Sequence, residues 1–172
     1  LHGSAHGGWD PGKVSASKDL EKDINLQISK KLQTYLEQGG STVLMTRTSD
    51  EALGSKKSED MRNRVEIVND YKSEILVSIH QNSFPNENVE GAQVFYFSNS
   101  DESKKLADLV QDELSNFVND GKKKEAKENS NYYLLKKTKT PAIIVECGFL
   151  SNPTETKKLT DDEYQEKIAW AV

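Results

Sequence analysis

His80 and Glu146 each follow directly after a short, largely apolar run, and both side-chain types can take part in hydrolysis. The runs are residues 75–79 and 142–145, whose continuous apolar character predicts strands that are buried on both faces of a sheet. In open α/β sheets, ligands bind at the carboxyl ends of the strands. We therefore expect His80 and Glu146 to lie near each other at one edge of the sheet, although either residue alone could have a structural role.

Two further candidates for the same site come earlier in the chain. His6 lies in a glycine-rich segment that could let backbone and ligand approach closely, and Glu21 begins a predicted helix, where the helix dipole favours a carboxylate. Two histidines and one carboxylate are a common ligand set for catalytic zinc, with a fourth position left for water. A further carboxylate can move a proton from this water to a leaving nitrogen. The inventory fits a metal hydrolase, although its members are scattered and form no local ligand motif.

The alternation of helices and strands along the chain predicts an α/β fold. Apolar residues recur with helical spacing in residues 20–36, 61–71, 106–118 and the tail from 154. Strand-like runs occur at residues 42–47, 75–79, 91–97, 132–135 and 142–146. Polar residues and glycine dominate the predicted loops, 1–19 and 119–131. Because two strands are apolar throughout, we expect a mostly parallel mixed sheet flanked by helices on both sides.

The composition limits the classes of partner. The 172 residues suffice for one domain that spans residues 1–172. The net charge of −5 argues against nucleic acid, because phosphate binding needs a concentrated basic patch. No apolar run approaches the roughly 18 residues of a transmembrane segment, and no signal peptide is visible. The single cysteine, Cys147, is expected to be a buried structural thiol, and Arg47, Arg62 and Arg64 to be structural or surface residues.

Six segments, in a fixed order over nearly the whole chain, carry a resemblance to a known enzyme family. They are residues 6–12 (HGGWDPG), 21–26 (EKDINL), 45–50 (MTRTSD), 78–83 (SIHQNS), 91–96 (GAQVFY) and 141–153 (PAIIVECGFLSNP). On these segments the sequence resembles the zinc-dependent N-acetylmuramoyl-L-alanine amidases. The resemblance implies a three-layer fold, zinc bound by His6, Glu21 and His80, and Glu146 as the catalytic residue. The implied reaction is hydrolysis of the lactyl amide bond between N-acetylmuramic acid and L-alanine in peptidoglycan.

Three segments resemble most closely the germination-specific, spore-cortex branch of this family. They are residues 79–84 (IHQNSF), 131–135 (NYYLL) and 164–170 (YQEKIAW). The branch implies that the substrate is cortex peptidoglycan, in which cleavage prepares muramic-δ-lactam. The substrate in turn implies export to the cell wall or the forespore cortex space. Because the chain leaves no obvious room for an inhibitory helix before the catalytic segment, we expect regulation to come from an activating protein partner.

The sequence departs from the family pattern just before His6. The family usually has an apolar strand there, whereas residues 1–5 show none and are interpreted as residues of a tag, with His2 disordered and not a ligand. This departure predicts a weakened zinc site. Three alternatives to an amidase therefore stay open. They are a zinc carboxypeptidase-like peptidase, a glycosidase that uses Glu21 and Glu146, and a catalytically weak module that binds the wall or a protein partner.

Overall fold

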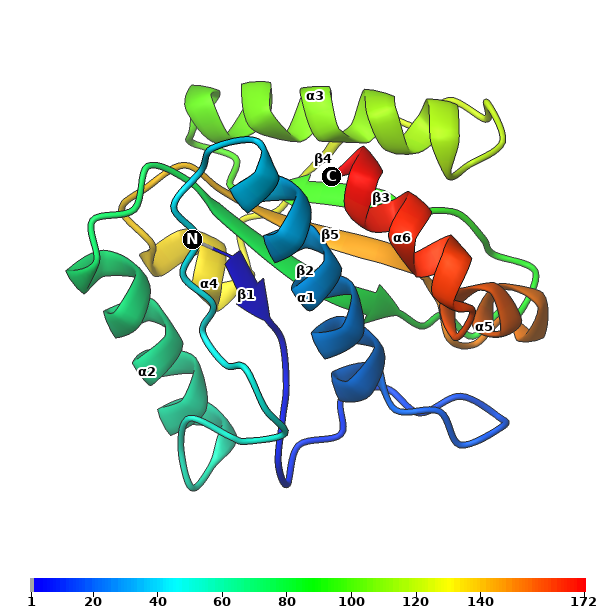
Figure 1. Cartoon of the computed structure of the whole chain (residues 1–172), viewed down its shortest axis with the longest axis horizontal. Helices are drawn as coiled ribbons and strands as arrows, with labels where there is room; N and C mark the ends of the chain where they lie inside the picture. The colour runs from blue at the N-terminus through cyan, green and yellow to red at the C-terminus, as the bar shows by residue number, and fades with distance from the viewer. Residues whose placement is uncertain (1) are drawn as a thin grey trace.

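The computed structural model describes residues 2–172, in which five strands form one sheet and six helices surround it (Figure 1). Leu1, the first of the residues interpreted as a tag, lies outside the described residues. The strands are β1 His2–Ser4, β2 Leu76–Asn82, β3 Gln93–Tyr96, β4 Lys127–Glu128 and β5 Ala142–Phe149. The helices are α1 Glu21–Gln38, α2 Lys57–Asp70, α3 Asp101–Phe117, α4 Tyr133–Lys137, α5 Pro153–Leu159 and α6 Asp162–Ala171.

The sheet is mixed and mostly parallel, in the strand order β1-β2-β5-β3-β4. β2 is parallel to both β1 and β5, and β4 is parallel to β3. β3 is antiparallel to β5. The two strands that carry His80 and Glu146 are therefore direct neighbours in the middle of the sheet.

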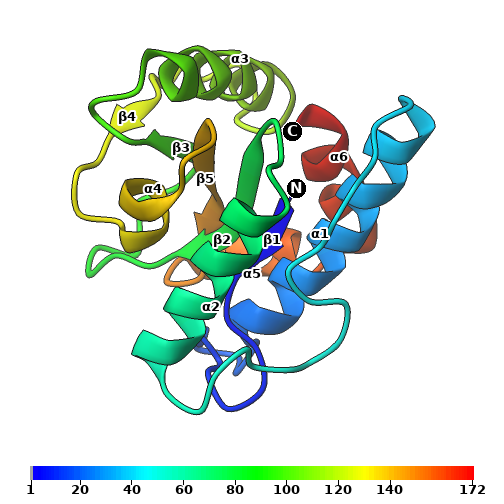
Figure 2. The same cartoon turned by 90° about the vertical axis from the view of Figure 1, so that its left-hand side faces the viewer.

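Alternating side chains of the central strands divide the apolar core into two parts. Val77 and Ile79 of β2 contact a large cluster that includes side chains of α1, α3 and α6. Leu76 of β2 and Ile144 of β5 contact a smaller cluster formed with α2 and α4. Figure 2 shows the sheet between α1 and α6 on one side and α2 and α4 on the other. The predicted fold, a mostly parallel mixed sheet with helices on both sides, is confirmed.

The strand expected over residues 42–47 was wrong, and two strands, β1 and β4, lie in segments that were expected to be loops. Residues 42–47 form no strand; their ladder contact is a single bridge between Met45 and His2. His2, expected to be disordered, is fully buried and lies in β1 opposite Val77. β1 could not be predicted from the sequence, because Gly3 and the small residues after it lack the β-branched side chains typical of strands. Pairing with β2, a tertiary interaction, forms this strand.

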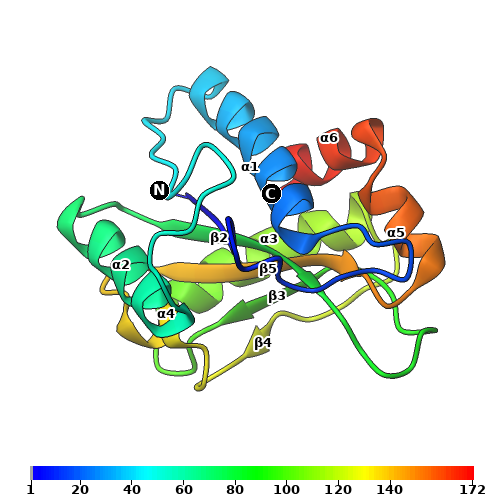
Figure 3. The same ribbon diagram turned by 90° about the horizontal axis from the view of Figure 1, so that it is seen from below.

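Residues 132–135 are also not a strand, because α4 begins at Tyr133. Aromatic and apolar residues over a short run fit a strand and a buried helix equally well. Leu134 and Leu135 both enter the smaller apolar cluster, where they contact the side of the sheet that α2 also covers. α2 and α4 lie side by side over this face (Figure 3).

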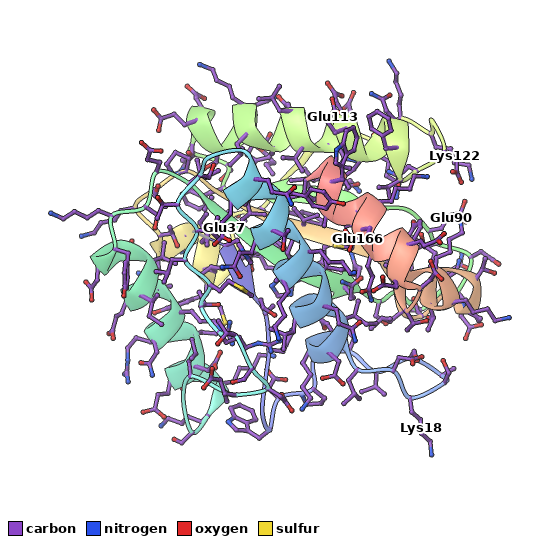
Figure 4. All side chains as sticks on the ribbon, viewed as in Figure 1. Lys18, Glu37, Glu90, Glu113, Lys122 and Glu166 are labelled. Atoms are coloured by element: carbon purple, nitrogen blue, oxygen red, sulfur yellow. The ribbon has the colours of Figure 1, made fainter. Side chains whose placement is uncertain are left out.

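Charged side chains occupy the periphery of the molecule. Figure 4 labels several of them, among them Lys18, Glu90 and Lys122. Glu90 and Lys122 form an ion pair at 2.5 Å. Glu166 of α6 accepts hydrogen bonds from Lys31 and Tyr35, at 2.7 and 2.9 Å, and so ties α6 to α1. Among the described residues, no helix has both the length and the apolar character needed to cross a membrane.

Candidate functional site

The register of β2 and β5 brings His80 and Glu146 together. The two residues are direct partners in the parallel ladder and both follow apolar strand segments. Side chains at equivalent positions of paired strands leave the sheet on the same face. This face is the one covered by α2 and α4, since Leu76 and Ile144 precede the pair by four and two residues on their strands. His80 and Glu146 lie together as expected, but within their strands, which continue past them to Asn82 and Phe149.

His6 reaches the same region through a tight turn after β1. Its φ is 59°, and the following Gly7 and Gly8 also have positive φ, at 140° and 56°. A Cβ atom on Gly7 would lie 2.1 Å from the carbonyl oxygen of Glu51, so this position requires glycine. The turn is held by Arg64, whose Nη2 donates to the His6 carbonyl oxygen at 2.9 Å.

A second arginine supports the strand that leads into this turn. The buried Arg47 donates to the carbonyl oxygens of Ser4 and Ala5, both at 3.2 Å, and to that of Lys22 at 2.6 Å. Burial, together with the nearby charge of Arg64, lowers the pKa of Arg47 to about 10. These contacts give Arg47 a structural role, as the sequence suggested. Arg47 thereby links β1 to the first turn of α1.

Glu21, the first residue of α1, is almost completely buried beneath the two histidines. Its Oε2 accepts a hydrogen bond from the Lys13 backbone at 2.7 Å, and its Oε1 accepts one from the Gln81 backbone at 3.1 Å. Gly12 makes room for it, because a Cβ atom on Gly12, whose φ is 68°, would lie 2.6 Å from Glu21 Oε2. The carboxylate therefore has one fixed position.

The three predicted zinc ligands form one compact cluster. His6 Nε2 lies 3.3 Å and His80 Nδ1 3.2 Å from Glu21 Oε1. One nitrogen or oxygen atom from each residue lies within 4.8 Å of the others. Ligand atoms of a tetrahedral zinc ion with bonds of about 2.0–2.1 Å are about 3.3 Å apart. The donor set and its spacing therefore fit a metal ion with a fourth position open.

Asp10, which the sequence did not single out, orients one of the histidines. Its Oδ2 lies 2.8 Å from His6 Nδ1, which leaves His6 Nε2 directed at the cluster. Carboxylates commonly bind the second ring nitrogen of metal-ligating histidines in this way. Burial opposes protonation of His6, but the hydrogen bonds and charges of Glu21 and Asp10 outweigh it and raise the His6 pKa.

The charges of the cluster keep Glu21 ionised. Burial disfavours its charged form, but the hydrogen bonds and charges of His6 and His80 outweigh burial and hold the Glu21 pKa well below its usual range. A buried carboxylate that stays ionised is an effective ligand for a divalent cation. The carboxylate is thus available as a ligand, and a bound cation would take the place of the histidine protons, because a ligating histidine must be neutral.

Glu146 differs from Glu21 in that one of its carboxylate oxygens is unpaired. Within residues 2–172, its buried Oε2 has no hydrogen-bond partner. Burial raises the Glu146 pKa to about 7, against the opposing charge of His80. A buried, unpaired carboxyl group is costly for folding and is typical of functional sites. With a pKa near neutrality, Glu146 can both accept and donate a proton.

Cys147, the neighbour of Glu146, takes no part in this arrangement. Its side chain is completely buried on the other face of the sheet, in the large apolar cluster. Burial raises its pKa well above the usual range for a thiol. The prediction of a buried structural thiol is confirmed.

A cavity of about 120 Å³ opens beside the cluster. His6, His80 and Glu146 line it on the side of the sheet, and α2 and α4 line it on the other side, where Arg64 and Tyr132 contribute. A substrate group that reaches the cluster can therefore contact α2 and α4 as well. Tyr132 was not predicted as a site residue, although it lies in the segment 131–135 that carries the resemblance to the spore-cortex branch.

Fold and site define an α/β protein with a candidate metal site near the carboxyl ends of its central strands. A profile of the N-acetylmuramoyl-L-alanine amidase family matches residues 3–172. The chain belongs to the N-acetylmuramoyl-L-alanine amidase family. The match includes most of the residues 1–5 interpreted from the sequence as a tag, in agreement with the strand β1 that the structure forms there.

Two relatives with amidase names agree with the family match. The germination-specific N-acetylmuramoyl-L-alanine amidase of Bacillus subtilis (strain 168) is 39% identical over 175 residues, which cover 97% of this chain and 73% of the relative. The probable cell wall amidase LytH of Staphylococcus aureus is 33% identical over 172 residues. That match covers 97% of this chain but only 53% of LytH, so the chain spans about half the length of that relative.

Solved structures share the fold closely. The CwlD amidase from Clostridioides difficile, solved in complex with the GerS lipoprotein, has a TM-score of 0.95 and 40% identity, covering 99% of this chain and 91% of that one. An N-acetylmuramoyl-L-alanine amidase from Clostridium difficile 630 has a TM-score of 0.88 and 32% identity, with coverages of 99% and 89%.

Proposed function

We propose that this protein is a zinc-dependent enzyme that hydrolyses the amide bond between N-acetylmuramic acid and L-alanine in peptidoglycan. One observation carries the proposal, namely the approach of His6, Glu21 and His80 within 4.8 Å, beside the unpaired carboxyl group of Glu146. Two imidazoles and one carboxylate favour zinc among the common divalent cations. The proposed substrate is inferred from the family to which the chain belongs.

The chain contributes positioning and proton transfer to this reaction. A bound zinc ion would activate water and the scissile carbonyl group. Glu146 takes a proton from the attacking water and later gives it to the departing alanine nitrogen. The carbon–nitrogen bond breaks, and the products are the lactyl carboxylic acid and a stem peptide with a free amino terminus. A pKa of about 7 suits Glu146 for both transfers, because the same group must act as base and then as acid.

The finer function that we propose is cleavage of spore-cortex peptidoglycan, as the first step towards muramic-δ-lactam. It is supported by the similarity to the germination-specific amidase of Bacillus subtilis. This function requires export to the cell wall or the forespore cortex space. We also propose an activating protein partner, because the similar CwlD amidase was solved in complex with a lipoprotein.

The test is product analysis with purified protein on cortex and vegetative peptidoglycan, in the presence of zinc or of a chelator. Mass spectrometry should detect free stem peptides only with zinc, and more of them from cortex if the cortex assignment holds. Glu146→Gln should reduce the rate by several powers of ten while the zinc content is retained. Glu163→Gln, a change of an exposed carboxylate, is the matched control and should leave the rate unchanged.

The products also separate the alternatives. Free amino acids would indicate a carboxypeptidase-like peptidase. New reducing ends that form despite the chelator would indicate a glycosidase that uses Glu21 and Glu146. Wall binding without any product, with metal or without it, would indicate either a binding module or an enzyme that is inactive without the proposed partner.

A further inference from the structure

Tyr132 lines the same cavity as His6, His80 and Glu146. The cavity that His6, His80 and Glu146 line on the side of the sheet is closed on the other side by Tyr132 and α4. The tyrosine side chain is half-buried. Its segment contributes no residue to the metal cluster. Metal binding therefore does not explain why this tyrosine lies at the cavity.

The ring and backbone of Tyr132 are held in place. Its backbone N–H donates to Asn129 Oδ1 at 2.9 Å, which fixes the start of α4. Its ring makes an edge contact with Phe95 of β3, with ring centroids 5.6 Å apart at an angle of 88°. These contacts restrain the side chain on the side away from the cavity.

The hydroxyl group, in contrast, has no partner in the part of the chain that the structure describes. Of the other donors that line the cavity, Arg64 is already engaged by the carbonyl oxygens of Ser4 and His6 and by Asp60, whereas Lys57 and Tyr133 are exposed residues. Burial, and after it the negative charges of Glu146 and Glu21, raise the pKa of Tyr132. The hydroxyl therefore keeps its proton at neutral pH and is free to donate it in a hydrogen bond.

We propose that the Tyr132 hydroxyl donates a hydrogen bond to the carbonyl oxygen of the scissile amide and is a catalytic residue of the reaction. Negative charge develops on this oxygen when water attacks the carbonyl carbon, so the hydrogen bond becomes stronger in the transition state than in the bound substrate. No proton is transferred from the tyrosine. The inference rests on the proposed amidase function and adds a substrate contact to it.

The test compares the wild-type protein with Tyr132→Phe on soluble glycan-peptide fragments of peptidoglycan, with zinc present. The substitution keeps the ring against Phe95 and removes only the hydroxyl. We expect kcat to fall by about 100-fold, the size typical for loss of one oxyanion donor, with KM changed less than about twofold. Zinc content and melting temperature should match the wild type. Tyr71→Phe, which removes an exposed hydroxyl, is the matched control and should keep full activity.

Each other result overturns the inference in a recognisable way. An unchanged kcat in Tyr132→Phe, or a rise in KM alone, would show that the hydroxyl does not stabilise the transition state. A lower kcat accompanied by zinc loss or a lower melting temperature would show a structural role. If the wild-type protein itself releases no stem peptide, the proposed function fails and the inference fails with it.

Discussion

Asp10 determines how His6 presents its ring to the candidate metal site, and this control can be measured. Asp10→Ala removes the partner 2.8 Å from His6 Nδ1. We expect the zinc affinity, measured by competition with a chromophoric chelator, to fall by about 10- to 100-fold. Asp112→Ala, a change of an exposed aspartate of α3, is the control. Equal affinities in both variants would contradict an orienting role for Asp10.

His2 makes the stability of the fold depend on pH. Burial lowers its pKa from 6.5 to about 4, and both ring nitrogens lack a partner within the described residues. Between these two pH values the unfolded chain binds a proton that the folded chain does not. The unfolding free energy should therefore fall as the pH drops from about 6.5 to about 4, by up to about 3 kcal/mol.

Denaturant unfolding at several pH values checks this expectation. His2→Phe keeps the volume of the ring and removes the titration, so its stability should decline less than that of the wild type over the same range. A wild-type protein and a His2→Phe variant with parallel pH dependences would contradict the assignment.

At the residue scale, the position of a functional side chain could be predicted where that side chain directly follows a recognisable strand or begins a recognisable helix. His80 and Glu146 were placed in this way, and the structure brings them together. Asp10 and Arg64 could not be predicted, because their partners are a ring nitrogen and backbone carbonyl groups that acquire their positions only in the folded chain. His2 was misjudged for the same reason, since its burial depends on pairing with β2.

At the scale of elements, the turn before α1 controls the position of Glu21. Gly12→Ala would place a Cβ atom 2.6 Å from Glu21 Oε2 and would also strain a backbone with positive φ. Gly121→Ala imposes a similar strain at φ 77°, with no atom within 4 Å of the added carbon. Gly121→Ala should lose about 1 kcal/mol of unfolding free energy through backbone strain alone, and Gly12→Ala should lose more, because the clash with Glu21 is added.

Only Gly12→Ala should also weaken zinc binding, by about tenfold or more, because it alone displaces a proposed ligand. Chemical denaturation and zinc titration of the two variants separate backbone strain from displacement of Glu21. Similar zinc affinities in both variants would show that the turn tolerates the added carbon without moving the carboxylate.

The elements that the sequence predicted correctly share strong periodicity or continuous apolar character. β2 and β5 are apolar runs buried on both sides, and α1 repeats an apolar residue at helical spacing. The errors fall on short segments that give no clear period, namely β1, β4, α4 and residues 42–47. Their structures depend on contacts with distant parts of the chain, which a local pattern does not contain.

At the scale of the whole molecule, metal binding should stabilise the fold, because the cluster exists only in the folded chain. Free zinc at 100 times its dissociation constant adds about 2.7 kcal/mol to the unfolding free energy. For a chain of this length the melting temperature should rise by roughly 5–10 °C relative to protein with chelator. His80→Ala should lose most of this rise. Identical melting curves with zinc and with chelator would exclude a specific site.

The cluster has a consequence for the order of events when the chain folds. Its proposed ligands come from residues 6, 21 and 80, and the carboxyl group beside it, that of Glu146, comes from much later in the chain. Contacts of such long sequence separation form late, because the intervening chain must first be ordered. A refolding chain should thus regain helical signal before it binds zinc. An incomplete or partly folded chain would lack hydrolytic activity, so the cell wall is exposed to cleavage only by finished molecules.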